Sequence, residues 1–161
     1  EITTRLVGSE MCIRDSYADV VLMAAEAYNE TDNTPEAWKL LNSVRKRAGA
    51  REITTANYTE LMKEKVYKLN FISDGDDAGK FRTALYWERG FELAFEGQRK
   101  YDLIRWGIIK EALTLFSNRS SVKSAYPAGD NFQKGKHELF PIPLDELQLN
   151  PMFENKNNPN Y

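Results

Sequence analysis

The sequence predicts an all-α protein, and three observations support that prediction. Apolar residues recur at helical spacing in two neighbouring segments, residues 17–28 and 35–48. A later stretch, residues 86–106, has charged residues on one side of a helical projection and aromatic residues on another. The residues after Phe116 are rich in Gly, Ser, Asn and Pro, which interrupt helices. The expected architecture is a helical hairpin, a long packed helix and a proline-rich C-terminal strap.

Residues 1–16 have no periodicity that continues into the first helix. Within them, residues 5–16 are similar to a peptide that arises when sequencing-adaptor DNA is translated at the end of an assembled fragment. An ordinary flexible terminus is the alternative. We therefore predict a non-native or disordered leader over residues 1–16 and a helical domain over residues 17–161. Cys12, the single cysteine, is assigned no role.

The first predicted helix begins at Tyr17 and ends in a turn over residues 29–33. Most of its apolar residues share one face, while Leu22 and Met23 lie off it. The shared face holds Tyr17, Val20, Val21, Ala24, Ala27 and Tyr28. Apolar residues on more than one side predict a helix that is sandwiched between neighbours.

The second predicted helix begins with Thr34 as N-cap and Pro35 at the first helical position. It runs to about Ala48, and Gly49 is placed to end it as a C-terminal cap. Two helices joined by a short turn form an αα-hairpin, the unit of tetratricopeptide-type solenoids.

A third helix is predicted from the capping box Asn57-x-x-Glu60 to about Leu69. The acidic segment at residues 73–79, SDGDDAG, then breaks it. The spacing of these acids is similar to a calcium loop, but the glutamate expected near the end of such a loop is absent. A solvated turn is therefore expected here.

The long fourth helix is predicted to end near Trp106 and Gly107, with a short helix following at residues 108–116 and a polar loop at residues 117–135. On the long helix the charged arc holds Glu88, Arg89, Glu92, Glu96 and Arg99. The other arc holds Trp87, Phe91, Ala94 and Tyr101. A helix with two such different sides needs two different neighbours, so we expect it to be packed rather than isolated.

The charged arc could in principle serve catalysis or metal binding, because its three carboxylates recur at helical spacing. Helical di-iron and zinc sites need a histidine nearby, and the single histidine, His137, lies far downstream. Nearby arginines are expected to lower the carboxylate pKa values, the reverse of what a general acid requires. We therefore predict no catalytic residue, no metal and no cofactor, but an ion-pair lattice between packed helices. Its predicted members are Arg45, Arg47, Glu88, Arg89, Glu92, Glu96, Arg99, Asp102 and Arg105.

The composition and sequence also argue against several other classes of protein. The formal net charge of −2 and the pI near 5.6 argue against a nucleic-acid-binding footprint. No run approaches the roughly 18 apolar residues that a membrane span needs. Glycine-rich phosphate loops, nucleophile elbows and CxxC motifs are absent from the sequence.

Four segments together resemble the SusD/RagB family. They are residues 21–27 (VLMAAEA) with 41–49 (LNSVRKRAG), the signature 88–107 (ERGFELAFEGQRKYDLIRWG), residues 141–146 (PIPLDE), and 158–161 (NPNY). The resemblance covers residues 17–161 in the right order. The acidic turn resembles an insertion, and Asn160 stands where the family usually has glycine. Asparagine is the next residue to tolerate a left-handed backbone, so we expect the turn to survive.

The resemblance implies an all-α, tetratricopeptide-like fold in a surface lipoprotein of the bacterial outer membrane. It implies a non-enzymatic protein that binds a glycan or another nutrient and partners a SusC-like, TonB-dependent transporter. The lipid-bearing cysteine would lie in an N-terminal half outside this chain, making the chain a fragment. Two alternatives stay open: a tetratricopeptide-like scaffold for a protein partner, and a helical glycosidase using two of Glu88, Glu92 and Glu96.

The family resemblance also gives the charged arc a structural role, whereas the ligand site is harder to place. Arg45 and Arg47 are expected to face Glu92 and Glu96, with Gly97 allowing the backbones to approach closely. A sugar platform needs an exposed aromatic residue flanked by polar ones, and Tyr126, Asn131 and Phe132 in the polar loop meet that description loosely. The alternative is a loop that contains aromatic residues without a ligand-binding role. The tryptophans, Trp38, Trp87 and Trp106, lie in predicted helices and are expected to pack.

Overall fold

The computed structural model describes residues 3–62, 68–119, 127–154 and 156–161, and for residues 3–16 it describes the backbone only. The described residues contain helices and no strand, so the all-α prediction is confirmed. The chain divides into two compact units, Glu1–Arg99 and Lys100–Tyr161, which are considered separately. No helix in the described ranges has the length and apolarity needed to cross a bilayer.

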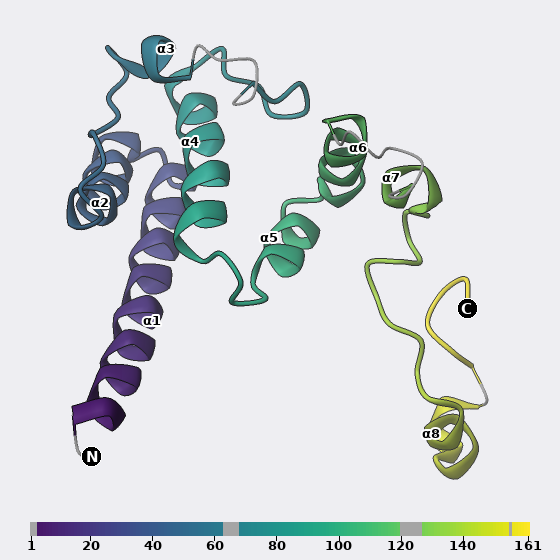
Figure 1. The fold of residues 1–161 in the computed structure, drawn as a ribbon. Helices are drawn as coiled ribbons and strands as arrows, with labels where there is room; N and C mark the ends of the chain where they lie inside the picture. Colours follow the sequence, from purple (N-terminus) through teal and green to yellow (C-terminus); the bar gives the residue numbers. More distant parts are fainter. Residues whose placement is uncertain (1–2, 63–67, 120–126, 155) are drawn as a thin grey trace. The chain divides into compact units, whose positions relative to one another are not determined.

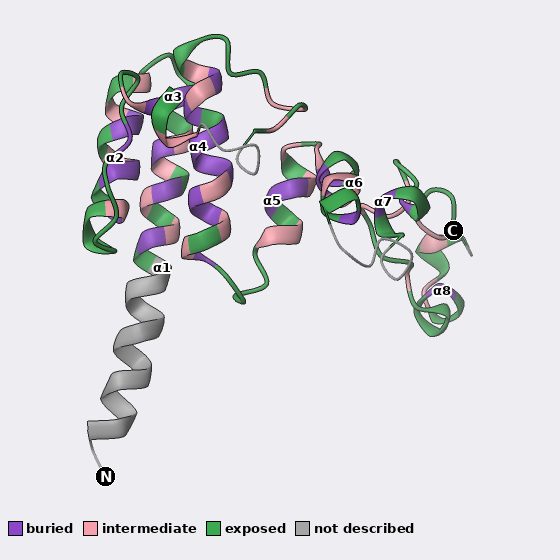
Figure 2. Ribbon diagram, turned by 45° about the horizontal axis from the view of Figure 1, so that its top comes forward, coloured by how far each residue is buried: buried purple, intermediate pink, exposed green. Residues whose placement is uncertain are grey.

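The first unit is built on three helices that lie side by side: α1 (Thr3–Glu30), α2 (Thr34–Arg47) and α4 (Asp77–Glu92) (Figure 1). Fully buried side chains from all three meet in its core, Leu22 from α1, Leu41 from α2, and Phe81 and Leu85 from α4. The Trp38 ring stands edge-on to the Phe81 ring, with centroids 5.1 Å apart. Buried positions gather on these helices in Figure 2. The predicted hairpin is therefore present, with α4 as its third partner.

The buried face of α1 is not the predicted one. Ala18, Leu22, Ala25 and Asn29 are buried, whereas Tyr17 is 70 % and Val20 55 % exposed. Two small alanines lie on this buried face, and α1 contacts both α2 and α4. The helix therefore packs against two neighbours, but through a face other than the predicted one. The α1 backbone also begins at Thr3, upstream of the predicted boundary at residue 17.

Helix α2 ends as predicted at a glycine. Gly49 has φ +72°, and its amide donates to Lys46 O while the Ala50 amide donates to Arg45 O. These two bonds form a Schellman motif, which satisfies carbonyls at the helix end. At the other end the N-cap is Asn33, one residue before the prediction. The Thr34 hydroxyl instead donates to Asn29 Oδ1 at 3.0 Å.

The buried side-chain amide of Asn42 holds the segment after α2 against that helix. Asn42 Nδ2 donates to Ile53 O at 2.7 Å, and Ile53 N donates to Asn42 Oδ1 at 2.8 Å. Helix α3 (Tyr58–Leu61) is much shorter than predicted, and Lys68 and Leu69 are not helical. Residues 63–67 lie outside the described ranges. The predicted capping box does not form. The Asn57 side chain instead accepts a hydrogen bond from Thr54 N and donates one to Glu52 O.

Replacing Asn42 by alanine is expected to lower the free energy of unfolding by about 2 kcal/mol, since it leaves both backbone groups of Ile53 buried without these partners. Ile53 is 1 % exposed, so water cannot readily replace the lost bonds. Urea unfolding followed by circular dichroism measures the change. Ser43→Ala, at the next and exposed position, is the control and should stay within about 0.5 kcal/mol of the wild type. An equal loss of unfolding free energy in the two variants would show that the Asn42 side chain does not hold this segment in place.

Helix α4 starts at an acidic cap and ends earlier than predicted. Asp76 Oδ1 accepts from Gly79 N at 2.7 Å, which gives one residue of the acidic turn a defined role. A Cβ at Gly79 would lie 2.0 Å from Ser73 O, so this helical position requires glycine. The helix stops at Glu92 because Phe95 and Gly97 have positive φ (68° and 79°). The prediction of one continuous helix to Trp106 is therefore wrong.

The second unit contains α5 (Arg99–Arg105), which begins at the end of the first unit, then α6 (Ile109–Arg119) and α7 (Ala128–Asn131). Helix α6 runs beyond the predicted end at Phe116, and α7 lies inside the predicted loop. A Cβ at Gly129 would lie 2.6 Å from the Thr114 backbone, so glycine permits the close approach of α6 and α7. Residues 120–126 lie outside the described ranges.

The C-terminal strap contains α8 (Leu144–Leu149) and the 3-10 helix η2 (Pro151–Phe153). Its last residues bond to the backbone of residues 135–142. Asn157 exchanges two hydrogen bonds with the Ile142 backbone, at 2.7 and 3.2 Å. Asn158 Nδ2 donates to Phe140 O and the Tyr161 hydroxyl donates to Leu139 O. These bonds hold the end of the strap, residues 157–161, against residues 135–142.

Asn160 adopts the left-handed backbone expected at a position where the family has glycine, with φ +69°. Its side chain also donates from Nδ2 to Gly135 O at 3.0 Å, a bond that glycine could not make. The turn therefore survives the departure from the family pattern.

Candidate functional site

Two arginines of α2 pair with two glutamates of α4. Arg45 Nη1 lies 2.5 Å from Glu88 Oε2, and Arg47 forms an ion pair with Glu92. Both pairs lie one helical turn before the expected ones. The physical reason is the early end of α4, because Glu96 follows Glu92 in a turn and no longer shares a helical face with it.

A third pair joins α4 to α1. Arg89 Nη1 lies 2.7 Å from Asp19 Oδ1, and the arginine side chain is only 3 % exposed. Sequence reasoning missed Asp19 because the apolar residues around it predicted a different buried face. A lone carboxylate in the apolar run Tyr17–Ala25 is the signal that could have found it. Buried guanidinium groups require a partner, so this contact fixes α4 against α1.

Burial controls the titration of Glu88. Its side chain is buried between α2 and α4, and this desolvation raises its pKa above the ordinary value of 4.5 despite the attraction of Arg45. Arg45 lowers the pKa of this carboxyl, but burial outweighs it, so the expectation of a net lowering is wrong. At Glu30, in contrast, a two-bond contact with Arg82 on a more exposed surface lowers the carboxyl pKa.

The raised pKa predicts a particular pH dependence. Because Glu88 holds its proton more tightly in the folded chain, its contribution to stability is fully present below pH 4.5 and falls as pH rises through the raised pKa. The difference in unfolding free energy between wild type and Glu88→Gln should therefore shrink as pH rises from about 4 to 7. Urea unfolding across that range measures it.

Glu30→Gln is the matched control for this titration. The Glu30 pKa is lowered, so its contribution is present above the ordinary value of 4.5 and is lost as pH falls through the lowered pKa. The wild-type advantage over Glu30→Gln should grow with pH, although solvent screening keeps it small. Parallel pH profiles for the two variants would contradict the assignment of opposite shifts.

The remaining predicted lattice members lie beyond the end of α4. Arg99 folds back onto α4, where its Nη1 donates to Tyr86 O at 2.8 Å and its guanidinium lies 3.9 Å from the Tyr86 ring centroid. Asp102 and Arg105 pair within α5 at 3.0 Å. Gly97 is not a close-approach position, because nothing lies within 4 Å of a Cβ built there. Its positive φ is what requires glycine.

The predicted sugar platform is not assembled in the described residues. Phe132 is 6 % exposed and stands edge-on to His137, so its ring is not an open stacking surface. Asn131 is exposed at the end of α7, and Tyr126 lies outside the described ranges. Of the tryptophans, Trp38 packs against Phe81 as expected, and Trp87 stacks on Phe91 with centroids 5.9 Å apart.

Chemically, the charged face is suited to holding helices together. Glu88 and Glu92 each face an arginine of α2, so both carboxylates take part in ion pairs between helices. The described ranges include no group of three or more His, Cys, Asp or Glu side chains placed to hold a metal ion. The face therefore positions α4 on the hairpin, with Arg45, Arg47 and Arg89 as the cationic contacts.

The order of hairpin, signature segment (residues 88–107) and strap has its counterpart in known proteins. The model of the SusD family matches residues 9–161. The chain belongs to the SusD family. SusD-like protein P25 of Formosa agariphila is 38 % identical over 136 residues, and SusD-like protein P2 of the same organism is 32 % identical over 146 residues.

A solved SusD homolog from Bacteroides thetaiotaomicron has the same fold over most of this SusD-family chain. The TM-score is 0.65, with 34 % identity, and the match covers 90 % of this chain and 26 % of that one. The chain likewise spans 22 % and 25 % of the two curated relatives. The matched region is therefore about a quarter of each relative's length.

Proposed function

We propose that this chain is part of a cell-surface protein that binds a glycan or another nutrient and delivers it to a SusC-like, TonB-dependent transporter of the outer membrane. The observation that supports this proposal is the match to the SusD family over residues 9–161. Attachment to the membrane through a lipid anchor outside this chain is part of the same proposal.

Each of the two units would contribute its own packed scaffold to such a protein. The hairpin of α1 and α2 is locked to α4 by ion pairs at Glu88, Glu92 and Asp19, and a strap closes on itself at the C-terminus. A scaffold of this kind needs no catalytic group. We therefore propose a non-enzymatic role, in which the paired glutamates hold structure instead of transferring protons.

Glycan binding can be tested by native electrophoresis of the purified chain in gels that contain one soluble polysaccharide each. Retardation by at least one polysaccharide, with no reducing sugar released on incubation, is the expected result. Release of reducing sugar that is lost in Glu88→Gln without loss of helicity would replace the proposal with the glycosidase alternative. Migration unchanged across a broad panel would favour the protein-interaction scaffold.

The partner can be tested in the native host by tagging the gene product at its C-terminus and purifying it from detergent-solubilised outer membranes. Recovery of a TonB-dependent transporter in stoichiometric amount is expected. Recovery of the tagged product without that transporter would contradict the partnership.

A further inference from the structure

One side of α1 is apolar and stays uncovered in the part of the chain that the structure describes. Tyr17 is 70 %, Val20 55 % and Tyr28 41 % exposed. With two alanines between them they form the outer face of α1, an arc of about 100° on a helical projection that holds Tyr17, Val20, Ala24, Ala27 and Tyr28. The buried residues Leu22 and Ala25 lie on another side of the helix. The outer face therefore comes in addition to the face that packs in the core of the first unit.

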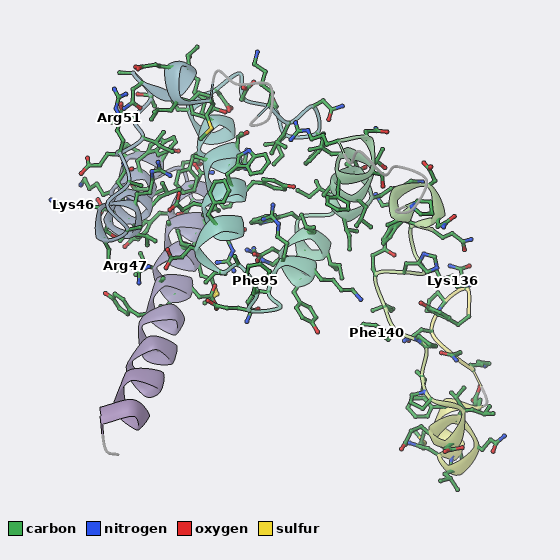
Figure 3. The ribbon with its side chains drawn as sticks, in the orientation of Figure 1. Lys46, Arg47, Arg51, Phe95, Lys136 and Phe140 are labelled. Carbon is green, nitrogen blue, oxygen red and sulfur yellow. The ribbon has the colours of Figure 1, made fainter. Side chains whose placement is uncertain are left out.

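The outer face contains no charged residue. The carboxylates within residues 17–30 project from a different side, and two of them pair with arginines of α4; they are Asp19, Glu26 and Glu30. A helical face that stays in water usually carries charge. Such charge is seen on α2 and the segment after it, where Lys46, Arg47 and Arg51 are exposed (Figure 3). An uncharged apolar face of about three helical turns is instead typical of a contact surface.

The spacing of the outer face indicates which kind of element covers it. Its residues recur at intervals of three and four, the pattern by which one helix packs against another. Ala24 and Ala27 are small and lie between the larger Tyr17 and Tyr28, so a second helix can approach α1 closely at the middle of the face. The expected partner is therefore an α-helix with an apolar stripe of its own.

The length of the relatives indicates where such a helix comes from. This chain spans 22 % and 25 % of the two SusD-like proteins of Formosa agariphila and 26 % of the solved homolog. About three quarters of each relative therefore lies outside the matched region. Helical hairpins that stack within one polypeptide bury their faces against the hairpins on either side. Helix α4 covers one side of the α1–α2 hairpin, which leaves the outer face of α1 for another helix of the same protein.

We propose that the outer face of α1 packs against an apolar helix from the part of the same polypeptide that lies outside residues 1–161. In the whole protein Tyr17 and Val20 are then buried, and α1 has helices on two sides. The proposal rests on the proposed function in one respect, that this chain is part of a longer protein of the SusD family. It concerns the assembly of the scaffold and makes no use of ligand binding.

The test measures the accessibility of a cysteine in the full-length gene product, purified as a monomer without the transporter. Val20→Cys is made with Cys12 and any further native cysteine replaced by serine, and its reaction with a maleimide is compared with the rate in urea. Lys39→Cys is the matched control, because the Lys39 side chain on α2 is 72 % exposed. We expect Val20→Cys to react about tenfold more slowly than Lys39→Cys in the folded monomer, relative to the unfolded rates.

Other outcomes would overturn the proposal. Equal relative rates at the two positions would show that the outer face stays in water. Protection of Val20→Cys that appears only in a dimer, or only in a complex with the transporter, would assign the face to a second copy or to the transporter. A gene product no longer than this chain would leave no helix to cover the face.

A photo-cross-link identifies the neighbour directly. Tyr17 is replaced by p-benzoylphenylalanine in the full-length gene product, which is illuminated and digested for mass spectrometry. The expected cross-linked peptide comes from the same polypeptide, outside residues 1–161, and has apolar residues at intervals of three and four. A peptide from the transporter or from α1 of a second copy would overturn the proposal.

This inference and the proposed function can fail separately. An accessible Val20→Cys in a gene product that polysaccharides still retard in native gels overturns the packing and leaves the proposed function standing. A protected Val20→Cys in a gene product that no polysaccharide retards supports the packing and contradicts glycan binding.

Discussion

Replacing Asp19 by alanine is expected to destabilise the chain by about 3 kcal/mol. The substitution leaves the guanidinium of Arg89, which is 3 % exposed, in a low-dielectric site without the carboxylate that faces it at 2.7 Å. Removing one partner of a buried pair is costly because the remaining charge cannot regain its hydration. Urea unfolding at pH 7, followed by circular dichroism, measures the loss.

The reverse substitution, Arg89→Met, is the informative comparison. Asp19 is 24 % exposed, so its carboxylate can reach water once the arginine is gone, and methionine fills much of the vacated volume. Arg89→Met should therefore destabilise less than Asp19→Ala, and the double variant should lose less than the sum of the two. Strict additivity would show that these two groups do not interact.

Replacing Phe81 by alanine should cost about 3–5 kcal/mol, the range for removing a large aromatic side chain from a packed core. Phe81 is fully buried, and its ring meets Trp38 edge-on between α2 and α4. Phe81 has one of the largest fully buried side chains, so its removal leaves a large cavity in the core. Thermal and urea unfolding should both show the loss, with a lower midpoint.

Phe91→Ala is the matched control on the same helix. Phe91 is 57 % exposed near the end of α4 and contacts Trp87 by stacking. Its replacement should cost about 1 kcal/mol or less. Similar losses at the two positions would contradict the core described for the first unit.

Several elements follow from local chemistry and were predicted correctly. Helix α2 was predicted because its apolar spacing and Gly49 are local signals, and Gly49 indeed ends it with a positive φ. Asn160 likewise adopts the left-handed backbone that its residue type tolerates. Such features depend on a few neighbouring residues, so the sequence contains all the information they need.

Other elements depend on contacts between distant residues and were predicted wrongly. The face of α1 that is buried includes two alanines, because close approach of α2 and α4 outweighs the greater apolarity of Tyr17 and Val20. The end of α4 determines which glutamates pair with Arg45 and Arg47. That end is set by positive backbone angles at Phe95 and Gly97, of which only the glycine was a visible signal.

The candidate ligand-binding residues also show that residue type alone does not predict burial. Asn131 and Phe132 were chosen for residue type alone, yet packing buries the Phe132 ring against His137. The return of residues 52–55 to α2 was not predicted, because it depends on the two hydrogen bonds between Asn42 and Ile53.

The sequence by itself determined the helical class, the hairpin and the family, since apolar spacing, capping residues and motif order are properties of the linear chain. Only the tertiary structure decided which faces are buried, which carboxylates meet which arginines, and how residues 52–55 return to α2. The physical reason is that burial and ion pairing depend on the mutual positions of helices. Those positions result from the packing of many side chains together.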